Sequence, residues 1–235
     1  IREQYAQGQP ALTQAIVAMG QNLMDVYKHG DATPHLNRAL VLRQAEAGGA
    51  SKSRDIAYIL YLQALNLFHL SKFAAAAKKF IEASKMLVDT MPSGDPLIGR
   101  CYCSQALNTA AQAKYLEAKA QAEKGYAILA KSCGTKRVET AEGFVSRIRI
   151  QILLGKEKDA LSLIQQALSL RRRLLGNEHP LVLEVLELQT DVLMSQGKLM
   201  EAGSFLSQAM DMAMTYFHTE GSSSDDIRLT NVKYL

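Results

Sequence analysis

A joint between two helices recurs four times along this chain, at a constant interval of 42 residues. Each joint has Lys in its middle position, and Ala follows four residues after that Lys. The joints are Ser71-Lys72-Phe73, Ala113-Lys114-Tyr115, Gly155-Lys156-Glu157 and Gly197-Lys198-Leu199, and the alanines are Ala76, Ala118, Ala160 and Ala202. Periods of this length are typical of stacked helical units, in which the exposed face of one unit becomes the core of the next. The spacing therefore predicts an all-α array of antiparallel helix pairs and favours a binding surface as the function.

The array is predicted to form a single domain over residues 1–235. Pro180 is expected to open a helix that ends at Gly197, and Gly176 is expected to cap the helix before it. We expect full repeats at 52–92, 95–134, 137–176 and 179–219, a degenerate helix pair within 1–50, and a C-terminal capping segment at 222–235.

The second helix of the degenerate pair is expected to begin at Thr33-Pro34. Threonine is a good N-cap, and proline suits the first helical position because its missing N–H would have no partner there. The residues His29-Gly30-Asp31 would then lengthen the joint, so that the register of the repeats is lost in this pair.

The composition is globular, with 48% hydrophobic and 21% charged residues. No uncharged apolar run approaches the roughly 20 residues that span a bilayer, so we expect no membrane span. The three cysteines, Cys101, Cys103 and Cys133, favour an intracellular reducing compartment over a disulfide framework. We expect the cytoplasm, with a mitochondrial location as the alternative. Cys101 and Cys103 are expected to pack between helices, because no further Cys or His lies at zinc-binding spacing.

The order of joint, Lys, apolar residue and Ala resembles the tetratricopeptide repeat (TPR), whose usual unit has about 34 residues. The segment Leu175-Gly176-Asn177-Glu178-His179-Pro180, followed by Gly197-Lys198-Leu199, is similar to the 42-residue repeats of kinesin light chain. This resemblance covers about residues 55–220. The His-Pro and Gly-Lys phrases are also similar to the C-terminal TPR-like domain of the SET-and-MYND lysine methyltransferases. The resemblance implies a right-handed α-solenoid, the TPR superhelix.

The resemblance also implies where a partner would bind, because the first helix of each TPR pair lines a concave groove. Mapped by register, the groove positions are Tyr61, Leu65, Phe68, Cys103, Leu107, Arg149, Glu187 and Asp191. They make the N-terminal half of the groove apolar and the C-terminal half charged, without the Lys/Asn clamp by which some TPR domains hold a terminal carboxylate. We expect a protein partner that offers an amphipathic helix or an extended apolar segment. The alternative is that these residues are core between helices or are covered by the chain's own termini.

The most prominent charge run is Arg171-Arg172-Arg173. It could form a basic patch for an acidic partner, phosphate or RNA. We favour the alternative, that these cations complement the negative end of a helix, because no aromatic residues accompany them as in a nucleic-acid platform. Nucleic acid is therefore not an expected partner.

The sequence contains no phosphate-binding loop, nucleophile elbow or zinc-helix spacing. We therefore expect no catalytic residues, no metal site, no cofactor and no enzyme activity. The leading prediction is a protein–protein interaction scaffold or adaptor that belongs to a multi-protein complex. The alternatives are a structural subunit of a large assembly, cytoplasmic or mitochondrial, and the accessory C-terminal domain of an enzyme whose catalytic part lies outside this chain.

Overall fold

The computed structural model describes residues 10–46, 53–134 and 137–219, and this part of the chain folds into ten helices without strands. The helices form five antiparallel pairs: α1 (Pro10–Asp25) with α2 (His29–Glu46), α3 (Arg54–His69) with α4 (Phe73–Thr90), α5 (Pro96–Ala111) with α6 (Tyr115–Cys133), α7 (Val138–Leu153) with α8 (Glu157–Leu175), and α9 (Pro180–Ser195) with α10 (Leu199–Thr219). The predicted all-α class is confirmed. The predicted capping segment at 222–235 lies outside the described residues.

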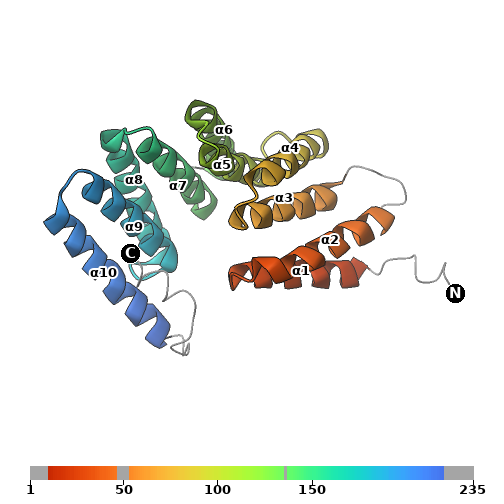
Figure 1. The fold of residues 1–235 in the computed structure, drawn as a ribbon, viewed down its shortest axis with the longest axis horizontal. Helices are drawn as coiled ribbons and strands as arrows, with labels where there is room; N and C mark the ends of the chain where they lie inside the picture. Colours follow the sequence, from red (N-terminus) through yellow and green to blue (C-terminus); the bar gives the residue numbers. More distant parts are fainter. Residues whose placement is uncertain (1–9, 47–52, 135–136, 220–235) are drawn as a thin grey trace.

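The five pairs follow one another around an arch, with α1 and α2 at one end and α9 and α10 at the other (Figure 1). First helices of successive pairs contact one another: α1 with α3, α3 with α5, α5 with α7, and α7 with α9. Among the described residues, no such contact joins the second helices of successive pairs. The first helices therefore form the concave side of the arch and the second helices its outer side, which is the arrangement of an α-solenoid.

The joints within the pairs share one hydrogen-bond pattern. Ser71 has a φ of +57°, and its amide donates to the carbonyl of Phe68 at 2.9 Å. The next amide, of Lys72, donates to the carbonyl of Leu67 at 2.9 Å. The same bonds and a positive φ recur at Ala113, Gly155 and Gly197. A residue with positive φ at this position ends a helix while its last carbonyls stay hydrogen-bonded, so the chain reverses without losing backbone partners.

A further joint of the same kind lies at Tyr27-Lys28. Tyr27 has a φ of +59°, and the amide of Lys28 donates to the carbonyl of Leu23 at 2.8 Å. Helix α2 begins directly afterwards at His29, and Pro34 lies inside it. The prediction that this helix begins at Thr33-Pro34 is therefore wrong.

The N-terminal pair keeps the internal spacing of the other repeats after its joint, and His29-Gly30-Asp31 do not lengthen that joint as predicted. Its joint at Tyr27 precedes the joint at Ser71 by 44 residues instead of 42, and the two extra residues lie outside the joint. The residues that follow it, Ala32, Leu36 and Ala39, are buried like Ala76, Phe80 and Ala83, which follow the next joint at the same offsets. This repeat is hard to recognise in the sequence because its joint is displaced from the 42-residue interval. It also has a tyrosine where two of the other joints have glycine.

The joints allow a test of stability, because three of them carry a side chain at positive φ. Left-handed backbone costs a residue with a Cβ about 1 kcal/mol relative to glycine. We expect Ala113→Gly, at a φ of +61°, to raise the free energy of unfolding by about 0.5–1 kcal/mol. Gly155→Ala, at a φ of +65°, should lower it by about 1 kcal/mol. Urea unfolding followed by circular dichroism measures both changes, and shifts of the same sign would contradict this account.

Two large apolar cores lie along the array, separated by a pair of helices rich in small residues. The first core extends from α1 to α5 around Phe80, and the second extends from α7 to α10 around Ile148 and Ile164. Between them, four alanines of α5 and α6 form a third, small cluster with Ile150: Ala106, Ala110, Ala118 and Ala122. These small side chains let the backbones of α5 and α6 approach closely.

Candidate functional site: the concave groove

A groove runs along the concave side of the arch in two adjoining compartments. The larger has a volume of about 570 Å³ and mostly apolar walls, and the smaller has a volume of about 250 Å³ and several charged side chains. Leu107, Val145 and Glu184 line both, so the compartments are continuous. The walls come from α3, α5, α7 and α9, and α6 and α8 contribute one residue each, Leu129 and Arg171.

The larger compartment, which we call the apolar compartment, is lined by residues that recur one helical turn apart on the inner helices. Its apolar side chains include Phe68, Ile152 and Leu188. At one edge His69 stacks on His29, with 4.7 Å between ring centroids. Burial lowers the pKa of His69, and the neighbouring His29 lowers it further, so both effects favour the neutral form of His69.

The smaller, polar compartment holds hydrogen bonds and ion pairs that join neighbouring inner helices. The hydroxyl oxygens of Tyr61 and Ser104 lie 3.2 Å apart, and burial raises the pKa of Tyr61 to about 12. Arg100 Nε pairs with Glu142 Oε2 at 3.0 Å. Burial also raises the pKa of the Glu142 carboxyl, against the opposing effect of Arg100. These contacts connect α3 to α5 and α5 to α7 along the groove.

Arg171 reaches the polar compartment from α8 and is only 1% exposed. Its Nη1 donates to the backbone carbonyl of Leu181 and, at 2.9 Å, to Glu184 Oε2. Its Nε has no hydrogen-bond partner within the described ranges. Glu184 Oε1 also lies 3.8 Å from Arg149 Nη2, so one carboxylate stands between two guanidinium groups.

The three arginines at the end of α8 do not share a surface, which the disfavoured alternative of a basic patch would require. Arg171 is buried, Arg172 is half-buried and only Arg173 is exposed. The register of the repeats explains the difference, because Arg171 occupies the position of Leu87 and Leu129, which are both 0% exposed. That periodic signal was present in the sequence and could have predicted the burial.

Three carboxylates lie along one face of α9, because Glu184, Glu187 and Asp191 are spaced by three and four residues. Burial raises the pKa of Glu187 and that of Asp191, Glu184 raises the pKa of Glu187 further, and Arg149 opposes both shifts. Neither Glu187 nor Asp191 forms an ion pair with any described residue. The C-terminal end of the groove is therefore acidic, with Arg149 as its nearby cation.

Six of the eight predicted groove residues line the two compartments: Tyr61, Phe68, Cys103, Leu107, Arg149 and Asp191. Leu65 instead packs against the N-terminal core, and Glu187 lies beside Asp191 where α9 meets α10. The register mapping missed Arg100, Glu142 and Glu184, which share one position of the repeat. A charged residue at the same position of three successive repeats was the signal that could have found them. The role of all these residues in binding stays a prediction.

Cys101 and Cys103 pack between helices. Burial raises the pKa of the Cys101 thiol to about 12 and that of Cys103 to about 11. Buried thiols with raised pKa are neutral at physiological pH and react slowly. In the part of the chain that the structure describes, no three His, Cys, Asp or Glu side chains gather as a metal site.

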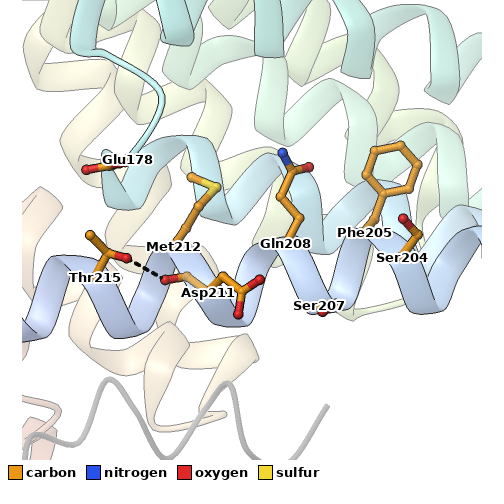
Figure 2. Close-up of a pocket in the computed structure, with 8 residues that line it drawn as sticks. All are labelled: Glu178, Ser204, Phe205, Ser207, Gln208, Asp211, Met212 and Thr215. Carbon is orange, nitrogen blue, oxygen red and sulfur yellow. Dashed lines mark hydrogen bonds between the residues drawn. The ribbon is translucent and has the colours of Figure 1, made fainter.

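A second hollow lies along α10 and is lined mostly by polar side chains (Figure 2). Glu178 faces it from the turn before α9, and the remaining lining comes from α10: Ser204, Phe205, Ser207, Gln208, Asp211, Met212 and Thr215. Within α10, the Thr215 hydroxyl donates to the carbonyl of Asp211 at 2.9 Å. Because one helix supplies nearly all of this surface, it lacks the opposing walls of the concave groove, and we assign it no function.

The fold is that of solved TPR-like repeat structures. A protein from Podosopora anserina described as a kinesin light chain with nearly identical TPR-like repeats has a TM-score of 0.65 and 16% identity, over 91% of this chain and 98% of that one. BtubC from P. vanneervenii has a TM-score of 0.69 and 15% identity, over 88% of this chain and 81% of that one. A thermophilic TPR protein from Thermus thermophilus has a TM-score of 0.61 and 19% identity, over 95% of this chain and 100% of that one.

These likenesses confirm the predicted TPR-like solenoid at the level of the fold. No family model matches the sequence, and no curated protein matches it either. None of the described helices combines the length and the apolar character that a membrane crossing requires.

Proposed function

We propose that this protein is a non-catalytic interaction scaffold that holds a segment of another protein in its concave groove. The observation that carries the proposal is the continuous groove formed by four inner helices, whose larger compartment has apolar walls and a volume of about 570 Å³. An apolar concave surface of this kind binds a partner by removing apolar area from water, at about 25 cal/mol per Å². An amphipathic helix or an extended apolar segment fits this description.

We propose that the protein works in an intracellular reducing compartment, cytoplasmic or mitochondrial, where its three free thiols would persist. A nucleic-acid partner is not proposed. The run Arg171-Arg172-Arg173 is the candidate surface for nucleic acid, but its first side chain is buried, its second is half-buried and only its third is exposed. A basic surface for phosphates needs several cations on one accessible face.

Leu107→Glu is the test of the groove, because Leu107 is half-buried and lines both compartments. A charge at this position should weaken capture of the native partner by at least about tenfold, since the carboxylate would lose its hydration when the partner binds. Affinity purification from the native source, with partners identified by mass spectrometry, measures the capture. Circular dichroism should show unchanged helicity.

The matched control is Leu116→Glu, the same change at a side chain on α6 that is 79% exposed. It should leave partner capture unchanged. If Leu107→Glu unfolds the protein, Leu107 is core and not groove lining. If it folds and captures the same partners with equal yield, the groove does not hold them.

A second candidate function, a structural subunit of a large assembly, is favoured by the apolar end of the array. Met194, Met210 and Met214 on the last pair are 51%, 44% and 48% exposed. Leu168, which occupies the position of Met210 one repeat earlier, is only 8% exposed. Co-migration of the native protein with a megadalton complex would support this candidate, and migration as a monomer would count against it.

A further inference from the structure

We propose that the segment held in the groove carries a basic side chain next to its apolar ones, with the apolar side chains in the apolar compartment and the cation against Glu187 and Asp191. This inference rests on the proposed function and specifies the chemistry of the partner. It follows from which charges in the groove already have partners and which do not.

The apolar side chains of the partner segment are inferred from the walls of the apolar compartment. Its volume of about 570 Å³ lies within the range of about 300–1,000 Å³ that is typical of ligand sites. Phe68, Leu107, Val145, Ile152 and Leu188 supply apolar walls on several sides. Side chains of the same character would be removed from water on entering it.

The basic part of the proposal comes from the balance of charges along the groove. Arg100 is paired with Glu142 at 3.0 Å, and Arg171 is paired with Glu184 at 2.9 Å. Glu184 also faces Arg149 at 3.8 Å. The groove arginines therefore each have a carboxylate partner.

Glu187 and Asp191 have no ion-pair partner in the described part of the chain. Both side chains are partly desolvated, which raises their pKa values; Glu184 adds like-charge repulsion at Glu187, and Arg149 offsets only part of both shifts. A cation brought by the partner would relieve this cost, whereas an acidic partner would increase it.

The spacing on α9 sets how close the two features of the partner must be. Leu188 lies in the apolar compartment, and Asp191 lines the same compartment three residues later. The apolar and acidic contacts are thus within about one helical turn, roughly 5 Å along the axis. The basic residue of the partner should accordingly lie three or four residues from its apolar anchor in a helix, or two residues from it in an extended segment.

The experiment uses the full chain and three synthetic fluorescent helical peptides of equal length. Each carries two Leu residues at positions i and i+4, and they differ only at position i+8, which is Lys, Gln or Glu. Fluorescence polarisation at 50 mM salt should show that the Lys peptide binds at least about tenfold more tightly than the Glu peptide, with the Gln peptide between them. In the double variant Glu187→Gln/Asp191→Asn, the Lys-over-Glu preference should fall to about twofold or less.

The matched control is the double variant Glu117→Gln/Asp159→Asn, which removes the same charge from exposed positions on α6 and α8. It should keep the full Lys-over-Glu preference. Retention of that preference in Glu187→Gln/Asp191→Asn would overturn the inference, as would tighter binding of the Glu peptide or the absence of binding by all three peptides. A third outcome is that the wild-type protein binds all three peptides equally and the Leu107→Glu variant binds none of them. This outcome would overturn the inference about charge alone, and the proposed function would stand.

The chain's own C-terminal residues are the competing occupant, because the sequence from 225 to 235 combines Ile227, Leu229 and Val232 with Arg228 and Lys233. The full-chain variant Arg228→Glu/Lys233→Glu distinguishes occupation of the groove by these C-terminal residues from occupation by another molecule. Unchanged affinity for the Lys peptide in this variant supports a partner from another molecule. An affinity at least about tenfold higher would show that the chain's own end occupies the groove, and would overturn the proposal.

Discussion

Gly125→Ala should lower the free energy of unfolding by about 3 kcal/mol, although alanine is normally about 1 kcal/mol better than glycine inside a helix. A Cβ on Gly125 would lie 2.6 Å from the Cys103 sulfur, 2.7 Å from the Gly99 carbonyl oxygen and 2.9 Å from the Cys103 amide nitrogen. Two of these three atoms belong to the backbone of α5. They can move only if α5 and α6 separate, and the small apolar cluster between the helices would then open.

Gly125→Val should go further and prevent the α5–α6 pair from forming, because two more carbon atoms would enter the same space. The corresponding residues of the other repeats are Ala83, Ala167 and Ala209, so their helices already leave room for a methyl group. Thermal and urea unfolding followed by circular dichroism measure both variants.

The matched control is Gly203→Ala on α10, where a Cβ would meet no atom within 4 Å. This variant should raise the free energy of unfolding by about 0.5–1 kcal/mol through helix propensity alone. The same substitution is therefore expected to have opposite signs at the two glycines. A stabilising effect of Gly125→Ala would show that α5 and α6 do not approach as the structure has them.

Glu184→Leu should lower the free energy of unfolding by about 3 kcal/mol, because it leaves the buried Arg171 guanidinium without its carboxylate. This is the lower end of the range for a broken buried pair, since the Glu184 side chain is itself 33% exposed and water reaches it. The double variant Arg171→Met/Glu184→Leu removes both charges, and it should lower the free energy of unfolding much less than Glu184→Leu does. In Arg171→Met/Glu184→Leu the unbranched Met side chain replaces the Arg stem at a position where other repeats carry Leu87 and Leu129.

Arg149→Met is the control for this ion pair, because Arg149 faces the same Glu184 but its side chain is 45% exposed. An exposed pair contributes about 0–1 kcal/mol, so this variant should stay close to the wild type. Urea unfolding of the three variants completes the comparison. If the double variant is as unstable as Glu184→Leu, the cost does not come from the uncompensated charge of Arg171.

Most of the helices could be predicted because the signals that end them are local and periodic. Pro180 opens α9, Gly176 has a φ of +87° at the end of α8, and Gly197 has a φ of +72° at the joint that follows α9. The joint at Tyr27 escaped prediction for a physical reason. Its left-handed conformation is held by hydrogen bonds to the preceding turn and does not require glycine, so only the period could indicate it, and it lies 44 residues before the joint at Ser71 instead of 42.

The groove could be predicted only in part. Register places Leu107, Arg149 and Asp191 at one repeated position, and all three line the apolar compartment. Register alone did not separate Leu65, which packs against the core, from the groove residues beside it. Side chains that face the core and side chains that face the groove recur at the same apolar spacing, because an inner helix is buried on more than one side.

The repeating order of residues was enough to predict an all-helical array and four of its joints, because these depend on contacts within a few residues. The packing of one helix on another decided the close approach at Gly125 and the pairing of Arg171 with Glu184. Those features join residues from different helices, and a distance between two helices depends on every side chain at their interface. The distance between two helices therefore cannot be predicted from a periodic pattern within one of them.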